Sequence, residues 1–108
     1  MMRICEEFYE SLRIPYRMIE VVSGELNDAS SRKVDLEGWY PTQRKYRELV
    51  SISNCTDFQS RMLDVQFLSG TSYQYPDMLN GTLIAIQRAI TCFLENWQSS
   101  SSSAIEIP

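Results

Sequence analysis

Apolar positions near the start of the chain predict a short amphipathic helix. Phe8, Leu12 and Ile14 follow two acidic residues and recur at roughly helical spacing. Pro15 disfavours helical geometry in the residue that precedes it, so we expect the helix to end before this proline.

Apolar runs in the first half of the chain predict strands, which cover residues 16–22, 34–40 and 46–54. Pro41 stops the second run, and the third run is the clearest strand. Between the first two runs, residues 23–33 are rich in Gly, Asn, Asp and Ser, which predicts a loop with one helical turn.

The middle of the chain gives weaker signals. Thr56 is a residue type that caps helices, and it precedes a candidate short helix over residues 57–61. Two further strand candidates, residues 63–68 and 72–75, flank a Ser-Gly-Thr turn.

The strongest helix signal covers residues 81–97. Its apolar residues recur every three or four positions and predict one continuous core stripe, made of Leu83, Ile86, Ile90, Phe93 and Trp97. Arg88 lies almost opposite this stripe, among small and apolar neighbours, so the helix is expected to be buried on both sides.

The order of these elements favours an α+β fold with an antiparallel sheet, because crossover helices between the strands are mostly missing. Residues 1–98 are expected to form one domain. The serine run over residues 99–103 is too polar to pack, which predicts a flexible Ser-rich tail over residues 99–108.

Composition narrows the range of functions. A chain of 108 residues with 44% hydrophobic content is typical of one soluble domain. Its net charge of -4 argues against wide contact with a nucleic-acid backbone, which needs clustered Lys and Arg. Histidine is absent, so Ser-His and Cys-His nucleophilic chemistry is excluded within the chain.

Cysteine usage and the first residues indicate an intracellular protein. Cys5, Cys55 and Cys92 have no CxxC spacing and are predicted to be reduced, buried thiols. The chain opens with acidic residues where a targeting peptide would be apolar or Arg-rich. No run approaches the roughly 18 apolar residues of a membrane span, so we expect no contact with a membrane.

Polar residues in the third predicted strand form the first candidate site. Glu48 and Ser51 stand in what otherwise looks like a central strand, where polar groups need partners. In one interpretation Arg47 and Glu48 are ordinary surface or cross-strand charges. In the other, Glu48 holds a divalent cation near Ser51, because Mg²⁺ takes hard oxygen ligands.

The second candidate site lies in the predicted long helix. Arg88 has room for a planar partner, and a guanidinium can stack on a base and bind phosphate oxygens. Alternatively, it extends to solvent or pairs with a structural carboxylate. Asn80 and Thr82 are either capping residues at the start of this helix or hydrogen-bond partners for a small polar ligand.

Four sequence blocks, taken together, resemble the seryl-tRNA synthetases, the serine-specific family of class II aminoacyl-tRNA synthetases. They are SGELNDA at 23–29, DLEGWYP at 35–41, RELVSISNCTDFQSR at 47–61, and LNGT through Arg88 to LENWQ at 79–98. The resemblance implies that residues 1–98 are the C-terminal part of a class II catalytic domain. In this domain a long C-terminal helix, motif 3, closes the antiparallel sheet.

The resemblance also implies ATP and Mg²⁺ as cofactors and L-serine as a substrate. The stretch Glu48, Leu49, Val50 and Ser51 would line the ATP site, with Glu48 placed to coordinate Mg²⁺. Arg88 matches the motif 3 arginine that contacts ATP. Asn80 and Thr82 match the polar pair that would recognise the serine substrate. The implied reaction activates serine to seryl-adenylate and then transfers the seryl group to tRNA(Ser).

Several parts of the family pattern have no counterpart here: the coiled-coil arm that grips tRNA, motif 1 and motif 2. The resemblance therefore implies a ligase fragment that is inactive alone, from a homodimeric family in which other regions hold tRNA(Ser). The alternative is a non-catalytic paralogue or remnant that acts in binding or scaffolding. The loop at 23–29 is closest to cytosolic members, which implies the cytoplasm, with a mitochondrial form as the other option.

Four positions depart from the family pattern. The family usually has Ala, Phe, Cys and Arg where this chain has, in order, Gly38, Tyr40, Ile52 and Met62. The shared ATP site also needs an irregular strand, because a regular pleat puts Glu48 and Ser51 on opposite faces. We therefore predict a bulge or similar irregularity between Glu48 and Ser51.

Overall fold

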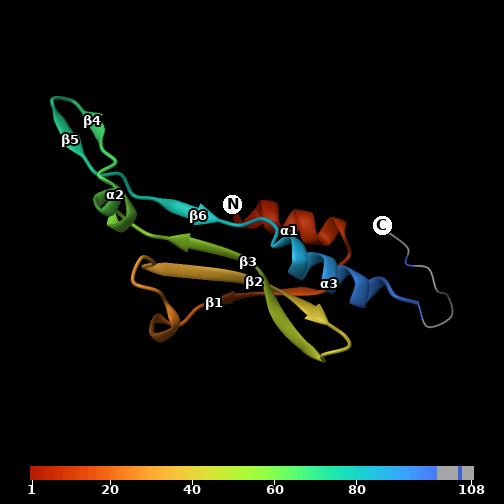
Figure 1. Cartoon of the computed structure of the whole chain (residues 1–108). Helices are drawn as coiled ribbons and strands as arrows, with labels where there is room; N and C mark the ends of the chain where they lie inside the picture. Colours follow the sequence, from red (N-terminus) through yellow and green to blue (C-terminus); the bar gives the residue numbers. More distant parts are fainter. Residues whose placement is uncertain (100–104, 106–108) are drawn as a thin grey trace.

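The computed structural model describes residues 1–99 and 105, and it contains one main antiparallel sheet with two helices on one face (Figure 1). The sheet has the strand order β1-β2-β3-β6, where the strands are β1 (Tyr16–Glu20), β2 (Arg32–Tyr40), β3 (Lys45–Asn54) and β6 (Leu79–Gly81). The two helices are α1 (Met2–Ser11) and α3 (Ile86–Trp97). The predicted α+β class and antiparallel sheet are confirmed.

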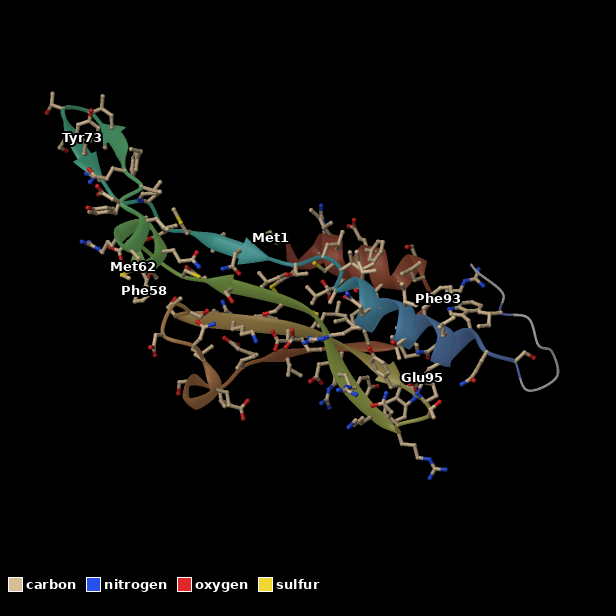
Figure 2. The ribbon with its side chains drawn as sticks, viewed as in Figure 1. Met1, Phe58, Met62, Tyr73, Phe93 and Glu95 are labelled. Carbon is tan, nitrogen blue, oxygen red and sulfur yellow. The ribbon has the colours of Figure 1, made fainter. Side chains whose placement is uncertain are left out.

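The remaining elements form a narrow projection at one end of a molecule that measures 67 × 28 × 20 Å. They are α2 (Phe58–Leu63), β4 (Phe67–Ser69) and β5 (Ser72–Gln74), with a 3-10 turn, η1 (Ser23–Glu25), in the loop between β1 and β2. Figure 2 shows Phe58, Met62 and Tyr73 at this end, far from Glu95 on α3. Among the described residues, no helix has both the length and the apolar character needed to span a membrane.

The hydrophobic core lies between the two helices and the sheet, and its buried members are Cys5, Tyr9, Ile14, Leu36, Tyr40, Leu49, Val50 and Cys92. Two buried hydroxyls are tied to backbone oxygens, because Tyr9 donates to Leu83 at 3.2 Å and Tyr40 donates to Arg88 at 2.8 Å. The core therefore joins the first helix to the last one through the middle strands. The prediction of buried cysteines is confirmed.

The predicted helix over residues 81–97 is wrong at its start. Residues 79–81 form β6 on the edge of β3, and the backbone N–H of Thr82 donates to the carbonyl of Ser51 at 3.1 Å. These backbone donors are used by the sheet, so the helix begins only at Ile86, after the extended residue Ala85. The last helix is thus 12 residues long, shorter than predicted, and Asn80 and Thr82 do not cap it.

The predicted core stripe of this helix is confirmed at Phe93, which packs against the core, but it is wrong at Ile86 and Ile90. Ile86 is 61% exposed and Ile90 is 53% exposed, whereas Ala89 and Cys92 are buried. The cause is a close approach of α3 to β2, since a Cβ added at Gly38 would meet the side chain of Leu49 and lie 3.0 Å from the sulfur of Cys92. Only small side chains fit between helix and sheet at this point, so Ile86 and Ile90 lie outside the contact.

Two smaller predictions in the middle of the chain are also wrong. Thr56 has a positive φ of 45° and makes no cap, because α2 begins after Asp57 and has no side-chain cap bond. The strand predicted over 63–68 is shortened to β4, since Leu63 ends α2 and Asp64 is left-handed. The predicted tail at 99–108 lies outside the described residues, except for Ser99 and Ile105.

The predicted irregularity in the third strand is confirmed. Leu36 pairs with Val50, but the next residue of β2, Glu37, pairs with Glu48. Leu49 is therefore an extra residue on β3, as in a β-bulge. This extra residue shifts the alternation of side chains by one position, so that Glu48 and Ser51 lie on the same face of the sheet.

The buried thiol and phenol groups predict that the fold loses stability at high pH. Burial raises the pKa of Cys92 to about 11 and the pKa values of Tyr9 and Tyr40 to about 12. The folded chain therefore holds more protons than the unfolded chain from about pH 9 upward, and the free energy of unfolding falls as the pH rises. We expect the urea midpoint to drop between about pH 8 and pH 10.5. A constant or rising midpoint would contradict this.

Candidate functional site

The face of the sheet that points away from the helices carries the predicted cation site. Because of the bulge, Glu48 lies opposite Glu37 and Ser51 lies opposite Asp35 in the strand register. Side chains alternate along a strand, so these four residues share one face. The apolar side chains of Leu36 and Val50, which alternate with them, belong to the core on the other face.

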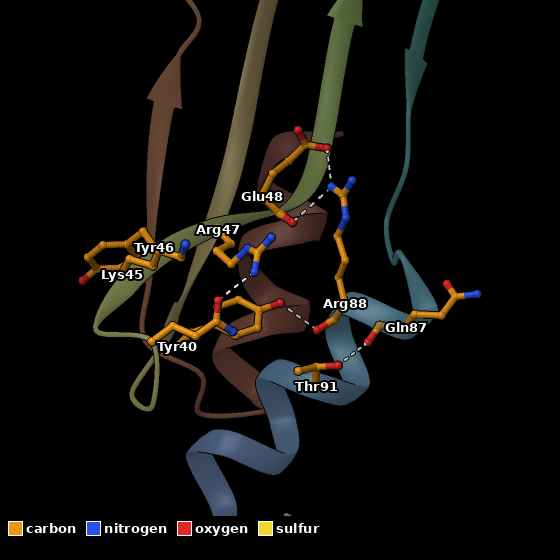
Figure 3. A pocket seen from close by; sticks show the side chains of 9 residues that line it. Tyr40, Lys45, Tyr46, Arg47, Glu48, Gln87, Arg88 and Thr91 are labelled. Atoms are coloured by element: carbon orange, nitrogen blue, oxygen red, sulfur yellow. Dashed lines mark hydrogen bonds and ion pairs between the residues drawn. The ribbon is translucent and has the colours of Figure 1, made fainter.

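Glu48 and Arg88, which are 40 residues apart in the sequence, meet at the edge of this face. The Nη1 atom of Arg88 donates to Oε1 of Glu48 at 2.9 Å and to the Glu48 carbonyl at 3.3 Å (Figure 3). Both side chains are partly exposed, so a ligand can reach each of them. The structure therefore brings together the two residues that the sequence singled out for a nucleotide and its cation.

A second cation lies on the other side of the Glu48 carboxylate. The ammonium of Lys33 is 3.9 Å from Oε2 of Glu48 and 3.3 Å from Oδ2 of Asp35. Asp35 is only 6% exposed, and its Oδ1 atom has no hydrogen-bond partner among the described residues. Neither Lys33 nor Asp35 was singled out as a site residue by the sequence.

A cavity of about 540 Å³ opens beside Arg88, between the β2–β3 hairpin and the start of α3 (Figure 3). Its lining residues are Tyr40, Gln43, Lys45, Tyr46, Arg47, Glu48, Gln87, Arg88 and Thr91. Three of them, Lys45, Arg47 and Arg88, are cations and only Glu48 is an anion, so the cavity suits a ligand with negative charge.

Of the four other predicted site residues, two are buried in the core and two lie in or directly after β6. Leu49 and Val50 are buried in the core, so only their backbone can face a ligand on the polar face. The side-chain amide of Asn80 donates to the sulfur of Cys55 at 3.4 Å. Thr82 lies beside Ser51 through its backbone bond and lines a small cavity of about 150 Å³ next to α1. Asn80 and Thr82 thus have different surroundings.

The sequence did not single out most residues of the large cavity. Tyr40, Gln43 and Lys45 come from the end of β2, the turn and the start of β3. Tyr40 lies in the 35–41 block but was not singled out for a site, and Gln43 and Lys45 lie outside the four blocks. One signal was present, because Arg44, Lys45 and Arg47 concentrate positive charge in this short hairpin. The structure adds that this hairpin folds against α3 at Arg88.

The antiparallel sheet, the bulged strand and the arginine at its edge define a class of protein. The chain belongs to the family described as the tRNA synthetase class II core domain (G, H, P, S and T), because the model of that family matches residues 1–97.

Within this class the similar proteins are serine–tRNA ligases. The serine–tRNA ligase of Encephalitozoon cuniculi is 50% identical over 108 residues, and the match covers 97% of this chain and 25% of that protein. The cytoplasmic serine–tRNA ligase of Saccharomyces cerevisiae is 48% identical, with 97% and 24% covered. The resemblance to seryl-tRNA synthetases is confirmed, and the chain spans about a quarter of the length of the curated relatives it matches.

Solved structures agree with this assignment. The seryl-tRNA synthetase of Pyrococcus horikoshii complexed with ATP matches with a TM-score of 0.93 and 42% identity, over 99% of this chain and 24% of that one. The cytoplasmic serine–tRNA ligase of Naegleria fowleri in complex with AMP matches with a TM-score of 0.89 and 45% identity, over 100% and 25%. Both of these structures contain an adenine nucleotide.

Proposed function

We propose that this chain supplies part of the ATP and serine site of a serine–tRNA ligase. The observation that carries the proposal is the meeting of Glu48 and Arg88 at the edge of the polar sheet face, beside a cavity with excess positive charge. An ATP phosphate chain needs both cations and a carboxylate-bound metal, and these two residues provide one of each.

Arg88 is the residue that would contact the nucleotide directly. Its guanidinium is planar and always charged, so it can bind phosphate oxygens with two parallel hydrogen bonds or lie flat on a base. The Glu48 carboxylate and carbonyl hold it in one place before a ligand arrives. Such preorganisation lets the site align ATP and neutralise its charge without a catalytic base.

The donor set on the polar face fits Mg²⁺. Glu48 offers a partly exposed carboxylate and Ser51, on the same face, offers a hydroxyl, and both are hard oxygen ligands. No cluster of three or more His, Cys, Asp or Glu side chains suited to a metal occurs within the described residues. Glu48 and Ser51 would therefore supply two ligands, with water or ATP phosphates at the remaining positions, and the ion would supply charge neutralisation at those phosphates when bound.

Serine recognition is the second part of the proposal. Asn80 lies in β6, which pairs with β3, and Thr82 comes directly after β6. Their amide and hydroxyl groups can bond to the hydroxyl of serine. A site that bonds a substrate hydroxyl rejects analogues that lack one. Transfer to tRNA(Ser) would use regions outside this chain, in a homodimer. The protein would act in the cytoplasm, since several relatives are named cytoplasmic serine–tRNA ligases.

A chimera tests this proposal. In it, this chain replaces the matching quarter of the Encephalitozoon cuniculi serine–tRNA ligase, to which it is 50% identical. We expect the chimera to catalyse serine-dependent exchange of pyrophosphate into ATP, while this chain alone and the chimera given alanine in place of serine do not. A folded chimera without exchange would support the alternative, a non-catalytic paralogue.

A further inference from the structure

Four charged side chains of alternating sign form a row across the polar face of the sheet. The row runs from Asp35 to Lys33 at 3.3 Å, from Lys33 to Glu48 at 3.9 Å, and from Glu48 to Arg88 at 2.9 Å. Each oxygen of the Glu48 carboxylate therefore faces a cation of the protein itself. A divalent cation that binds Glu48 must compete with at least one of them.

Lys33 is the easier of the two cations to displace. Its distance to Glu48 is 3.9 Å, which is an ion pair without a hydrogen bond, whereas Arg88 bonds to both the carboxylate and the carbonyl of Glu48. Lys33 also has a second anion within reach, Asp35. A lysine ammonium on a flexible stem can therefore leave one carboxylate without losing contact with the other.

Asp35 lies where it can bind this ammonium more closely. It is nine-tenths buried on the same face, and its Oδ1 atom has no hydrogen-bond partner within the described part of the chain. A buried carboxylate oxygen without a partner is costly, so it is a feature that needs an explanation. A lysine that moves fully onto Asp35 would satisfy this oxygen and free the Oε2 atom of Glu48.

We propose that Lys33 is a displaceable counter-ion of Glu48 and that Asp35 is the positioning residue that receives Lys33 when a divalent cation binds. The inference rests on the proposed function in one respect, the role of Glu48 as a cation ligand. Without the cation, Lys33 limits the repulsion between Asp35 and Glu48. With the cation, the same lysine neutralises Asp35, and the total charge of the site changes by the charge of the metal alone.

Titration of the full chain with Mn²⁺ alone, with the free ion followed by its electron paramagnetic resonance signal, tests the inference. Lys33→Met removes the competitor and is expected to tighten Mn²⁺ binding. Asp35→Asn leaves Lys33 on Glu48 and is expected to weaken binding by about 10-fold, the usual effect of losing a group that supports a metal ligand. Glu48→Gln is expected to abolish binding. Glu7→Gln, which removes a carboxylate paired with Arg3 on α1, is expected to change nothing.

The double variant Lys33→Met, Asp35→Asn separates this mechanism from direct binding by Asp35. If Asp35 acts through Lys33, its loss has no effect once the lysine is gone. A 10-fold weakening that persists in the Lys33→Met background would show that Asp35 binds the ion itself, and the proposal would fall. If Asp35→Asn does not fold, as judged by circular dichroism, the sign of the Lys33→Met effect alone decides.

The proposed function and this inference can fail separately. A wild-type chain that binds no Mn²⁺, or Lys33→Met binding no tighter than wild type, overturns the inference even where the chimera exchanges pyrophosphate. An inactive chimera overturns the proposed function, while the opposite effects of Lys33→Met and Asp35→Asn on Mn²⁺ affinity would still establish the exchange of counter-ions.

Discussion

Replacing Arg88 with alanine is expected to lower serine-dependent pyrophosphate exchange by the chimera by about 10²–10³-fold, the usual loss when one preorganised charge donor is removed. Arg88 is the cation nearest to Glu48 and lies at the mouth of the large cavity, so its removal takes away both a phosphate partner and the group that orients Glu48. The rate of exchange at saturating ATP and serine is the measurement.

Two further variants make this test specific. Arg88→Lys keeps the charge but loses the planar fork, and it is expected to fall between wild type and Arg88→Ala. Gln87→Ala changes a neutral residue that lines the same cavity, and it serves as the matched control. An Arg88→Ala chimera with exchange within about threefold of wild type would exclude Arg88 from transition-state stabilisation, because that ratio is worth less than 1 kcal/mol.

Replacing Leu36 with alanine is expected to lower the free energy of unfolding by about 2–5 kcal/mol, the range for truncating a buried leucine. Leu36 is fully buried on β2, between the helices and the sheet, and its loss would leave a cavity in the core. This loss is a large share of the stability of a typical domain, about 5–15 kcal/mol. Urea unfolding of the full chain followed by circular dichroism measures the change.

Ile4→Ala is the control for this experiment, because Ile4 is 60% exposed on α1 and its truncation leaves no cavity. Its effect is expected to stay within about 0.5 kcal/mol, as for most surface substitutions. Equal effects of the two variants would show that the core does not lie where the structure places it.

The strands of the sheet were largely predictable, and the reason is local. β1, β2 and β3 are rich in β-branched, aromatic and other apolar residues and lie between turn residues, and each was expected within a few positions of its observed bounds. β6 was not expected, because three residues of strand carry too little pattern and their partner lies far away in sequence. The bulge at Leu49 was predictable only because two residues with one implied ligand stood three positions apart.

The apolar stripe on α3 misled the prediction for a physical reason. Periodicity shows that one side of a helix avoids water, but it does not show which structure covers that side. In this chain Ala89 and Cys92 face the sheet at close range, and Ile86 and Ile90 remain exposed. The apolar side of a helix can be assigned to the core only if the sheet is known to be what covers it. Periodicity within one helix does not contain that information.

The candidate site was half predictable. Glu48 and Arg88 lie in specific sequence blocks, and the structure joins them. Lys33 and Asp35 were passed over because a lysine and an aspartate two residues apart in a strand are common surface residues. Their significance depends on the register of β2 against β3, which places both beside Glu48 and buries Asp35. That register is a property of strand pairing and is invisible in either strand alone.

The first and last helices are joined by direct bonds, and this has a consequence for how the chain is made. Trp97 donates from its indole to the carbonyl of Leu12 at 3.2 Å, and the hydroxyl of Tyr9 donates to Leu83. α3 is translated after α1, so Cys5 and Tyr9 of α1 cannot join the complete core until α3 has emerged from the ribosome. Contacts that distant in sequence close slowly. During that interval the apolar side of α1 is uncovered, and this is when binding by a chaperone would matter most.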